Sequence, residues 1–255
     1  MHFDLISDLH IDFWEKPLVW EGLGTSLIAV VAGDISRDWN TVYDYLLMLS
    51  EHYKHVIYID GNHEHNMLLN FRENANLLYD RLRPINNITY LHRSSIILDG
   101  TAFIGCNGWW TYDFAQPEYT TKQAYEKLLS MGLQQEFLEE ILFTAKEDSQ
   151  TLVNCMKIFD NDPNIENVVV VTHTAPFSRF RWAPSDVDFA NMARTGSSLL
   201  PKCLEHNSNR KIRTWCFGHV HTEIDVEIDG IRYVCHPRGL PNHSPPVYYP
   251  KLISF

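Results

Sequence analysis

The sequence predicts an α/β fold in which a mixed β-sheet is covered by helices on both faces. Short apolar runs that end in polar residues alternate along the chain with longer segments of helical periodicity. The chain has 255 residues, enough for one large domain, and its 45% hydrophobic and 21% charged residues are typical of a globular protein. We therefore expect a single domain over residues 1–255.

Five apolar runs have the length of buried strands, and each leads into residues that can bind a metal ion. The runs are Phe3–Ser7, Leu27–Ala32, His55–Ile59, Val168–Thr172 and Ile212–Phe217. In open α/β sheets ligands bind beyond the carboxyl ends of the strands, which is where these polar residues fall. The strand order along the chain therefore indicates a functional site at that edge.

The remaining segments complete an α/β pattern. Helices are predicted at Trp39–Glu51, Glu64–Leu82, Leu133–Phe159 and Ser197–Glu205. Antiparallel strands are predicted at Ile96–Leu98, Ala102–Ile104 and Ile231–Cys235, the last pairing with Glu223–Ile228 across Asp229-Gly230. Two segments, 107–121 and 177–195, lack clear periodicity, and we expect them to form loops on the substrate side.

Composition limits the functional classes. The formal net charge is −11 and no long run of Lys or Arg occurs, which disfavours long nucleic acids but leaves a small phosphorylated substrate open. The five cysteines are scattered singly, so neither a disulfide framework nor a thiolate zinc site is predicted. No stretch reaches transmembrane length or reads as a secretory signal. We expect a cytoplasmic protein with no membrane partner, and its oligomeric state stays open.

The residues after the predicted strands are the carboxylates and imidazoles that water-activating divalent metals require. Asp8 and His10 are two positions apart, so an extended segment directs both to one side. Asp34 follows Gly33, whose missing Cβ permits a tight turn, and is the carboxylate that two ions can share. The other donors are Asn62, His173, His219 and His221. Each fragment alone is commonly a turn or a core histidine, but the joint series predicts a two-metal site.

The series resembles the motifs of the calcineurin-like metallophosphoesterase superfamily, D-x-H, G-D, G-N-H-[D/E], H and G-H-x-H, in that order from Asp8 to His221. The resemblance implies a four-layer α/β/β/α sandwich with mixed central sheets. It implies one metal ion on Asp8, His10, Asp34 and His221, and a second on Asp34, Asn62, His173 and His219. It also implies that His63 lies beside the substrate as the general acid, with Asn62 near the phosphate.

One departure from the superfamily pattern is informative. Protein serine/threonine phosphatases continue the second motif as G-D-x-x-D-R-G, whereas Gly33-Asp34 is followed here by Ile35-Ser36-Arg37-Asp38. The carboxylate that orients the histidine acid in those enzymes therefore has no counterpart, and a protein-phosphatase activity is disfavoured. The stretches 107–111 and 235–239 look more like a bacterial-type branch of small phosphoesterases.

Residues outside the metal set carry weaker signals. Arg37 and Arg238 are candidates for anchoring phosphate, because a guanidinium donates to two oxygens at once. His236 is a third candidate, and surface or structural roles stay open for all three. The aromatic side chains of the first loop either stack on a nucleobase or pack that loop against the core; they are Trp109, Trp110, Tyr112 and Phe114.

The predicted reaction is hydrolysis of a phosphoester by water that two divalent ions activate. The leading interpretation is a phosphodiesterase acting on a small nucleotide-like substrate. A phosphomonoesterase is the alternative, and a non-catalytic scaffold that keeps the fold for protein binding is a further one. A scaffold would be expected to have lost ligands, yet every metal position is filled. Mixed nitrogen and oxygen ligands suit Mn, Fe, Zn, Co or Ni, and we expect Mn.

Overall fold

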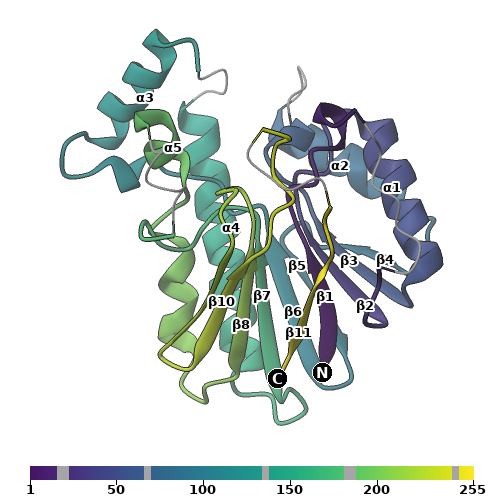
Figure 1. Cartoon of the computed structure of the whole chain (residues 1–255). Helices are drawn as coiled ribbons and strands as arrows, with labels where there is room; N and C mark the ends of the chain where they lie inside the picture. The colour runs from purple at the N-terminus through teal and green to yellow at the C-terminus, as the bar shows by residue number, and fades with distance from the viewer. Residues whose placement is uncertain (16–22, 66–69, 134–137, 181–187, 243–246) are drawn as a thin grey trace.

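The computed structural model describes residues 1–15, 23–65, 70–133, 138–180, 188–242 and 247–255. Two β-sheets form its centre (Figure 1). The first has the order β11-β1-β2-β3-β4, with β1 at His2–Ile6, β2 at Ile28–Ala32, β3 at His55–Ile59, β4 at Ile88–Tyr90 and β11 at Lys251–Ser254. Its pairings are parallel except that of β1 with β11.

The second sheet has the order β5-β6-β7-β8-β10-β9. Its strands are β5 (Ser94–Leu98), β6 (Thr101–Cys106), β7 (Asn167–Thr172), β8 (Ile212–Phe217), β9 (Ile224–Ile228) and β10 (Ile231–Cys235). The outer pairs β5–β6 and β9–β10 are antiparallel and the inner pairs are parallel. Both sheets are therefore mixed.

Helices cover the outer face of each sheet (Figure 1). On the first sheet, α1 (Trp39–His52) and α2 (Phe71–Leu82) pack through residues such as Leu46 and Leu78. On the second, α4 (Leu138–Phe159) and the short 3₁₀ helix η4 (Leu200–His206) bury Leu152 and Leu200. Helix α1 begins where Asp38 accepts a hydrogen bond from the Thr41 backbone N–H, an N-cap that satisfies an otherwise unpaired donor.

A third apolar core lies between the sheets. It joins Phe3 and Val30 of the first sheet to Phe103 and Val169 of the second. The Phe3 and Phe103 rings meet edge to face with their centroids 5.6 Å apart. Helices, sheet, sheet and helices thus form four layers, which confirms the predicted α/β/β/α sandwich.

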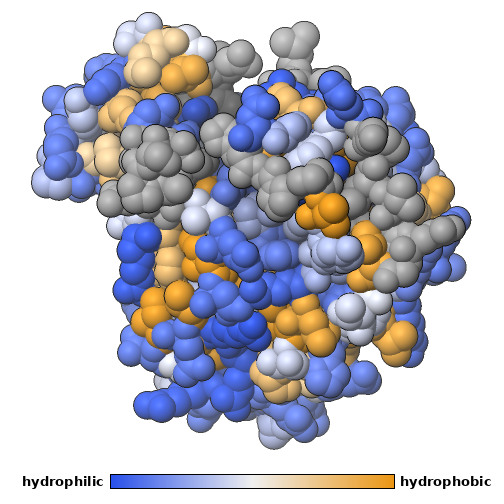
Figure 2. Space-filling view, viewed as in Figure 1, coloured by the Kyte–Doolittle hydropathy of each residue, from blue (hydrophilic) through white to orange (hydrophobic). Residues whose placement is uncertain are grey.

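The remaining helices extend beyond one end of the layers. Helices α3 (Thr121–Ser130) and α5 (Phe189–Arg194) lie there together with the first turns of α4, at the upper left of Figure 1. Both chain ends lie at the opposite end of the sheets. In the same view, hydrophilic residues cover most of the surface, with smaller hydrophobic areas between them (Figure 2).

The predicted strands agree with the structure to within a few residues, whereas several helices differ. The segment 64–82 forms α2 only from Phe71, after the N-cap Asn70, and a 3₁₀ turn at His63–His65; residues 66–69 lie outside the described chain. The segment 133–159 is helical from Leu138, and residues 134–137 are likewise outside it. The segment 197–205 contains most of the 3₁₀ helix η4 instead of an α-helix, and Pro201 lies near its start, where a missing backbone donor is tolerated.

Two predicted loops contain helices. Helix α3 starts at the end of segment 107–121, where Thr120 and Gln123 form a reciprocal capping box, a signal present in the sequence. Helix α5 lies in segment 177–195, whose residues 181–187 lie outside the described chain.

Strands β4 and β11 are not among the strands predicted from the sequence. None of the helices in the described ranges combines the length and apolarity needed to cross a membrane.

Candidate active site

The predicted metal ligands sit on sharp turns just beyond the strands. Asp8, His10, Asp34, His219 and His221 all have a left-handed backbone, with φ between 44° and 68°. Non-glycine residues rarely adopt this conformation, and they are enriched at functional sites where the surrounding structure enforces it. The turns therefore point these side chains into the space between the two sheets' ends at some cost in backbone energy.

Glycines beside these ligands leave no room for a side chain. A Cβ on Gly61 would overlap Asp34 Oδ1, and one on Gly218 would lie 2.5 Å from Asp8 Oδ2. Such contacts are too short for non-bonded atoms, so both carboxylates approach the neighbouring backbone only because glycine stands there. The G-N-H and G-H-x-H motifs thus owe their glycines to close packing around the ligands.

One group of donor atoms comprises Asp8, His10, Asp34 and His221, whose ligand atoms lie within 4.8 Å of one another. The Nε2 atoms of His10 and His221 are 2.8 Å apart. His10 Nε2 is 3.7 Å from Asp34 Oδ2, and His221 Nε2 is 3.5 Å from Asp8 Oδ1. Two imidazole nitrogens and two carboxylates converge on one point, as the first predicted metal site requires.

A second group comprises Asp34, His173 and His219, within the same 4.8 Å limit. His173 Nε2 lies 3.3 Å from Asp34 Oδ2 and 3.1 Å from Asn62 Oδ1. Its Nδ1 is 2.9 Å from the Ala32 carbonyl, which makes Nδ1 a hydrogen-bond donor and Nε2 the nitrogen that faces Asp34 and that a metal would take in place of a proton. Asp34 therefore belongs to both groups.

The two buried carboxylates have opposite pKa shifts. Burial raises the pKa of Asp8 to about 7, because it outweighs the attraction of His173. Burial acts in the same direction on Asp34, but the charges of His173 and His63 outweigh it and hold the Asp34 pKa well below its ordinary value. Asp34 is thus the carboxylate that stays ionised, as a ligand shared by two cations must be.

The buried imidazoles also differ. Burial lowers the pKa of His10 and of His219 well below the ordinary value, so both rings are neutral and can offer a lone pair. Burial also lowers the pKa of His173, but the negative charge of Asp34 outweighs burial and raises the His173 pKa to about 10. The proton of His173 therefore occupies the place where a cation would neutralise Asp34.

The donor set fits divalent metal ions. Asp8 Oδ2 and His10 Nδ1 are buried side-chain atoms without a hydrogen-bond partner in the described structure, which is costly unless another group satisfies the site. Two carboxylates, an amide oxygen and four imidazoles are the hard and borderline ligands that Mn, Fe, Zn, Co and Ni accept. Buried carboxylates and histidines packed this closely are compatible with bound cations and unfavourable without them.

Glu64 contributes a contact that the sequence analysis missed. Its buried carboxylate accepts hydrogen bonds from the backbone N–H groups of Asp34 at 3.1 Å, Ile35 at 2.7 Å and Gly61 at 2.7 Å. Burial and the nearby Asp34 charge nevertheless raise the pKa of Glu64 to about 8. Glu64 joins the β2 and β3 turns, and its place as the acidic residue after Asn62-His63 was the available signal.

His63 lies at the opening of the site, with its side chain 19% exposed. Its Nε2 is 3.8 Å from Asp34 Oδ2, and its backbone N–H donates to Asp34 Oδ1 at 2.8 Å. Arg37 Nε donates to His63 Nδ1 at 3.2 Å, and the Arg37 guanidinium lies 4.6 Å from the centroid of the Phe13 ring. Arg37 thus contacts the histidine from the position where protein phosphatases carry a carboxylate.

The other two phosphate candidates lie on the neighbouring 236–239 loop. Arg238 is buried, with its guanidinium 4.0 Å from the Trp14 ring centroid, and its backbone N–H donates to Ser7. His236 Nε2 is 2.8 Å from the Tyr249 carbonyl, and its ring stacks on Tyr248. His236 Nδ1 and the Nε and Nη1 atoms of Arg238 are buried without a hydrogen-bond partner in the described structure, and a contact with phosphate stays a prediction for each residue.

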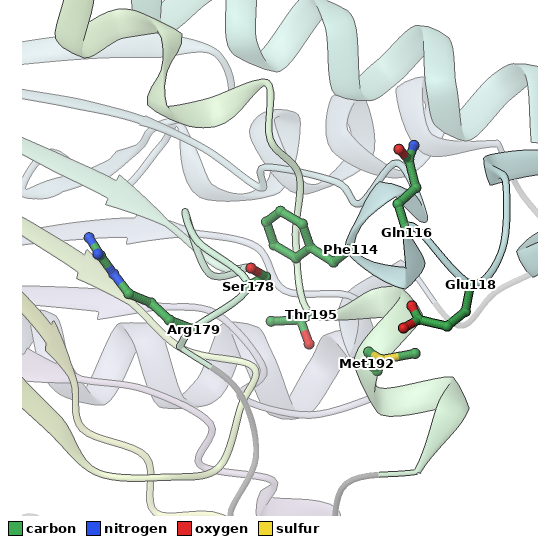
Figure 3. A pocket seen from close by; sticks show the side chains of 7 residues that line it. All are labelled: Phe114, Gln116, Glu118, Ser178, Arg179, Met192 and Thr195. Atoms are coloured by element: carbon green, nitrogen blue, oxygen red, sulfur yellow. The ribbon is translucent and has the colours of Figure 1, made fainter.

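The interpretation of the aromatic loop as a stacking platform is wrong for three of its four residues. Trp109, Trp110 and Tyr112 are at most 2% exposed, because they form a core with α3, α4 and α5. Trp110 also stacks on His219, with ring centroids 5.5 Å apart. Phe114 is the exception, since it lines a pocket between the segments 113–118 and 178–195 (Figure 3).

Comparisons with known proteins agree with this architecture. The family model of calcineurin-like phosphoesterases matches residues 1–223. The chain is similar in structure to phosphopantetheinyl hydrolase from Mycobacterium tuberculosis, at a TM-score of 0.77 and 16% identity, covering 98% of this chain and 95% of the other. A dimetal phosphatase from Danio rerio aligns at a TM-score of 0.47 and 15% identity, over 92% and 87%. The similarity to the Mycobacterium tuberculosis hydrolase supports the fold, whereas the similarity to the Danio rerio phosphatase is too low to support a conclusion. A comparison with curated proteins finds no match.

Proposed function

Because the chain belongs to the calcineurin-like phosphoesterase family, we propose that it is a two-metal phosphodiesterase acting on a small, nucleotide-like phosphodiester. The observation that carries the proposal is the position of Asp34. Its Oδ2 lies within 3.7 Å of His10 Nε2 and 3.3 Å of His173 Nε2, one from each group of donor atoms. Paired-metal phosphatases hold their ions a few ångströms apart, which a shared carboxylate makes favourable.

The residues divide into ligands and groups that face the substrate. Asp8, His10, Asp34 and His221 would hold one ion, and Asp34, Asn62, His173 and His219 the other. When bound, the ions supply Lewis acidity towards the phosphoryl oxygens and activate water. Mixed nitrogen and oxygen ligation suits Mn, Fe, Zn, Co or Ni, and Mn²⁺ is the activating ion that we propose among them. The five free cysteines support a reducing, cytoplasmic location.

His63 is assigned the role of general acid. In the neutral ring Arg37 Nε–H donates to His63 Nδ1, which fixes the orientation of the ring; in the acid form both ring nitrogens carry a proton, and the one at Nε2 is transferred. Nε2 is also the nitrogen on the Asp34 side, at 3.8 Å from Oδ2, so the proton points towards the reacting centre. Arg37 itself is exposed beside this ring, where its guanidinium can also hold a phosphate oxygen. As the imidazolium, His63 would give its Nε2 proton to the departing oxygen and be left as the neutral ring.

Two alternatives remain, one with a different substrate class and one in which the protein does not catalyse hydrolysis. A phosphomonoesterase would use the same ligands, because the ions bind the phosphoryl group in either case. A non-catalytic scaffold predicts missing or displaced ligands, whereas the two donor groups are complete here. The net charge of −11 supports a small substrate over a long nucleic acid. Hydrolysis of a diester is the proposal, and hydrolysis of a monoester is its first alternative.

The test is a hydrolysis screen of the full chain after metal removal and reloading with Mn²⁺, Zn²⁺ or Co²⁺. The substrates are bis-nitrophenyl phosphate, nitrophenyl phosphate, cyclic nucleotides, nucleoside diesters and a pantetheinyl phosphodiester. We expect metal-dependent turnover with diesters preferred over monoesters. Preference for monoesters would replace the proposal by its first alternative, and absence of turnover with two bound ions would favour the scaffold.

A further inference from the structure

A pocket of about 470 Å³ opens beside the proposed active site. Seven side chains line it, Phe114, Gln116, Glu118, Ser178, Arg179, Met192 and Thr195 (Figure 3). They come from the two segments predicted as substrate-side loops, one around 113–118 and the other at 178–195. Small-molecule sites typically enclose roughly 300–1,000 Å³, so the space suits a group of nucleoside size.

The pocket is joined to the metal ligands through backbone contacts. The Thr195 carbonyl accepts a hydrogen bond from Ala175 at 3.0 Å, two residues after His173. The Arg194 carbonyl lies 2.9 Å from Nε2 of His219. One wall of the pocket is therefore fixed to a histidine from each of two strand ends, so the pocket borders the His173 and His219 donor group.

The lining offers a flat apolar face and hydrogen-bond acceptors. Phe114 and Met192 supply an aromatic ring and a thioether. Glu118 is exposed, and within the described residues its carboxylate makes no hydrogen bond or ion pair; the same holds for the amide of Gln116. A carboxylate only accepts hydrogen bonds, so Glu118 favours a ligand that carries N–H donors.

The pocket is not built for the phosphate itself. Its described cationic lining residue is Arg179, whose guanidinium lies 4.6 Å from the Phe177 centroid and 5.4 Å from that of Phe180. In Figure 3 the Arg179 side chain points away from the other labelled residues. Glu118 extends towards Met192 in the same view, so the charged group on that side of the described lining is a carboxylate. The pocket therefore suits the organic part of a substrate.

From this lining we propose that the pocket binds an amino-bearing nucleobase, with Phe114 as the stacking face and Glu118 as the acceptor of the amino N–H. The proposal rests on the proposed function for the reaction that follows binding, but the binding itself does not require turnover. Purines with an exocyclic amino group, adenine and guanine, satisfy the carboxylate. Unsubstituted purine lacks that group and, in its riboside, has no N–H on the base; hypoxanthine still has an N1–H donor, so purine riboside is the matched comparison.

The first experiment measures binding of the nucleosides adenosine, guanosine and purine riboside to the full chain by calorimetry. We expect adenosine or guanosine to bind about tenfold or more tightly than purine riboside, as for a hydrogen bond to a charged group, and Glu118→Gln to abolish that difference. Phe114→Ala should weaken all three by roughly tenfold, in the range for loss of base stacking. The matched controls Glu126→Gln and Phe143→Ala alter exposed residues outside the pocket and should bind as the wild type does.

The second experiment measures kcat/KM for nitrophenyl esters of adenosine and guanosine monophosphates and for methyl nitrophenyl phosphate, which has no base. The two pocket variants should lose about tenfold on the nucleoside esters and stay within about twofold on the methyl ester. Equal losses on both substrates, equal nucleoside affinities or a loss confined to a pantetheinyl ester would overturn the nucleobase proposal. Nucleoside binding without hydrolysis of any ester would instead leave the pocket assignment standing and refute the phosphodiesterase.

Discussion

The two groups of donor atoms that share Asp34 differ in how their histidines are held. In one, His173 and His219 each bond a backbone carbonyl through the ring nitrogen that faces away from the shared ligand, at 2.9 Å. In the group that contains His10 and His221, His10 Nδ1 is buried without a hydrogen-bond partner in the described structure, and the His221 side chain is 18% exposed. Carbonyl contacts fix the tautomer and orientation of a ligand ring. The His173 group is therefore better preorganised for binding a metal.

The largest effect should come from removing the carboxylate that joins the groups. Asp34→Asn is expected to fold, to lose both ions or the spacing between them, and to lose activity by about 10³-fold or more, because metal stabilisation of the transition state amounts to several kcal/mol. Metal analysis and turnover measure the two losses. Asp44→Asn makes the same chemical change on the exposed face of α1 and should retain both ions. Near-normal turnover of Asp34→Asn with full metal content would contradict the shared-ligand assignment.

The next effect concerns His63, which contacts Asp34 but belongs to neither group of donor atoms. His63→Ala should retain both ions and lose roughly 10²–10⁴-fold in rate on a nucleoside or alkyl diester, the range for general acid catalysis. The loss should be much smaller on a nitrophenyl diester, whose leaving group departs without protonation. Asp34→Asn should lose both activities alike. Equal losses of His63→Ala on both substrates would indicate that the residue shapes the site, and loss of an ion would make it a ligand.

A smaller effect should separate the two groups by metal affinity. Titrating the metal-free protein with Mn²⁺ should give two binding steps, with the first ion about 10–100-fold tighter, the range over which supporting hydrogen bonds change metal affinity. His221→Ala should remove the weaker step and keep the tighter one. His219→Ala should do the reverse. Loss of the tighter binding step in His221→Ala would show that the His10 and His221 group, and not the His173 group, binds its ion more tightly.

The strand ends were predictable from the sequence because their signal is local. Each apolar run ends at a predicted metal ligand. Because alternate residues of an extended segment point to the same side, Asp8 is expected beside His10, and His219 beside His221. The resemblance of the motif order to a known superfamily supplied the four layers and the division between two ions. The family match and the layered cores confirm the fold, and the structure brings the predicted donors together.

The loops were less predictable because their contacts join residues far apart in the chain. The burial of Trp110 depends on packing against His219 and the α3–α5 core, which no periodicity in segment 107–121 reveals. The pocket similarly needs Phe114 and Met192 from separate segments. Glu64 had a sequence signal, its place beside His63, but its partners across the β2 turn appear only in the fold.

The preorganised group also rests on a buried polar network behind it. The Asn107 carbonyl accepts the His173 backbone N–H at 2.8 Å, and the Asn107 side-chain amide donates to the Asp60 carbonyl at 3.0 Å. The Asp60 carboxylate in turn accepts from the Tyr90 hydroxyl at 2.7 Å and bonds His65 Nε2. Burial alone would raise the pKa of Asp60, but the charge and hydrogen bond of His65 outweigh it and hold that pKa well below its ordinary value.

The last prediction tests whether this network supports one group of donors more than the other. A carboxyl with a lowered pKa stabilises the fold above its unfolded pKa of about 4, and the contribution is lost as pH falls towards the folded value. Asp60→Asn should therefore unfold more easily at pH 7 by about 1.5–3 kcal/mol, the range for hydrogen bonds to a charged group, and the difference should shrink below about pH 4. Urea unfolding of the metal-free proteins measures it. In the Mn²⁺ titration the variant should weaken the tighter step and leave the other unchanged, because Asn107 contacts the His173 backbone. A stability difference that persists undiminished at pH 3, or equal weakening of both steps, would show that the network does not distinguish the two groups.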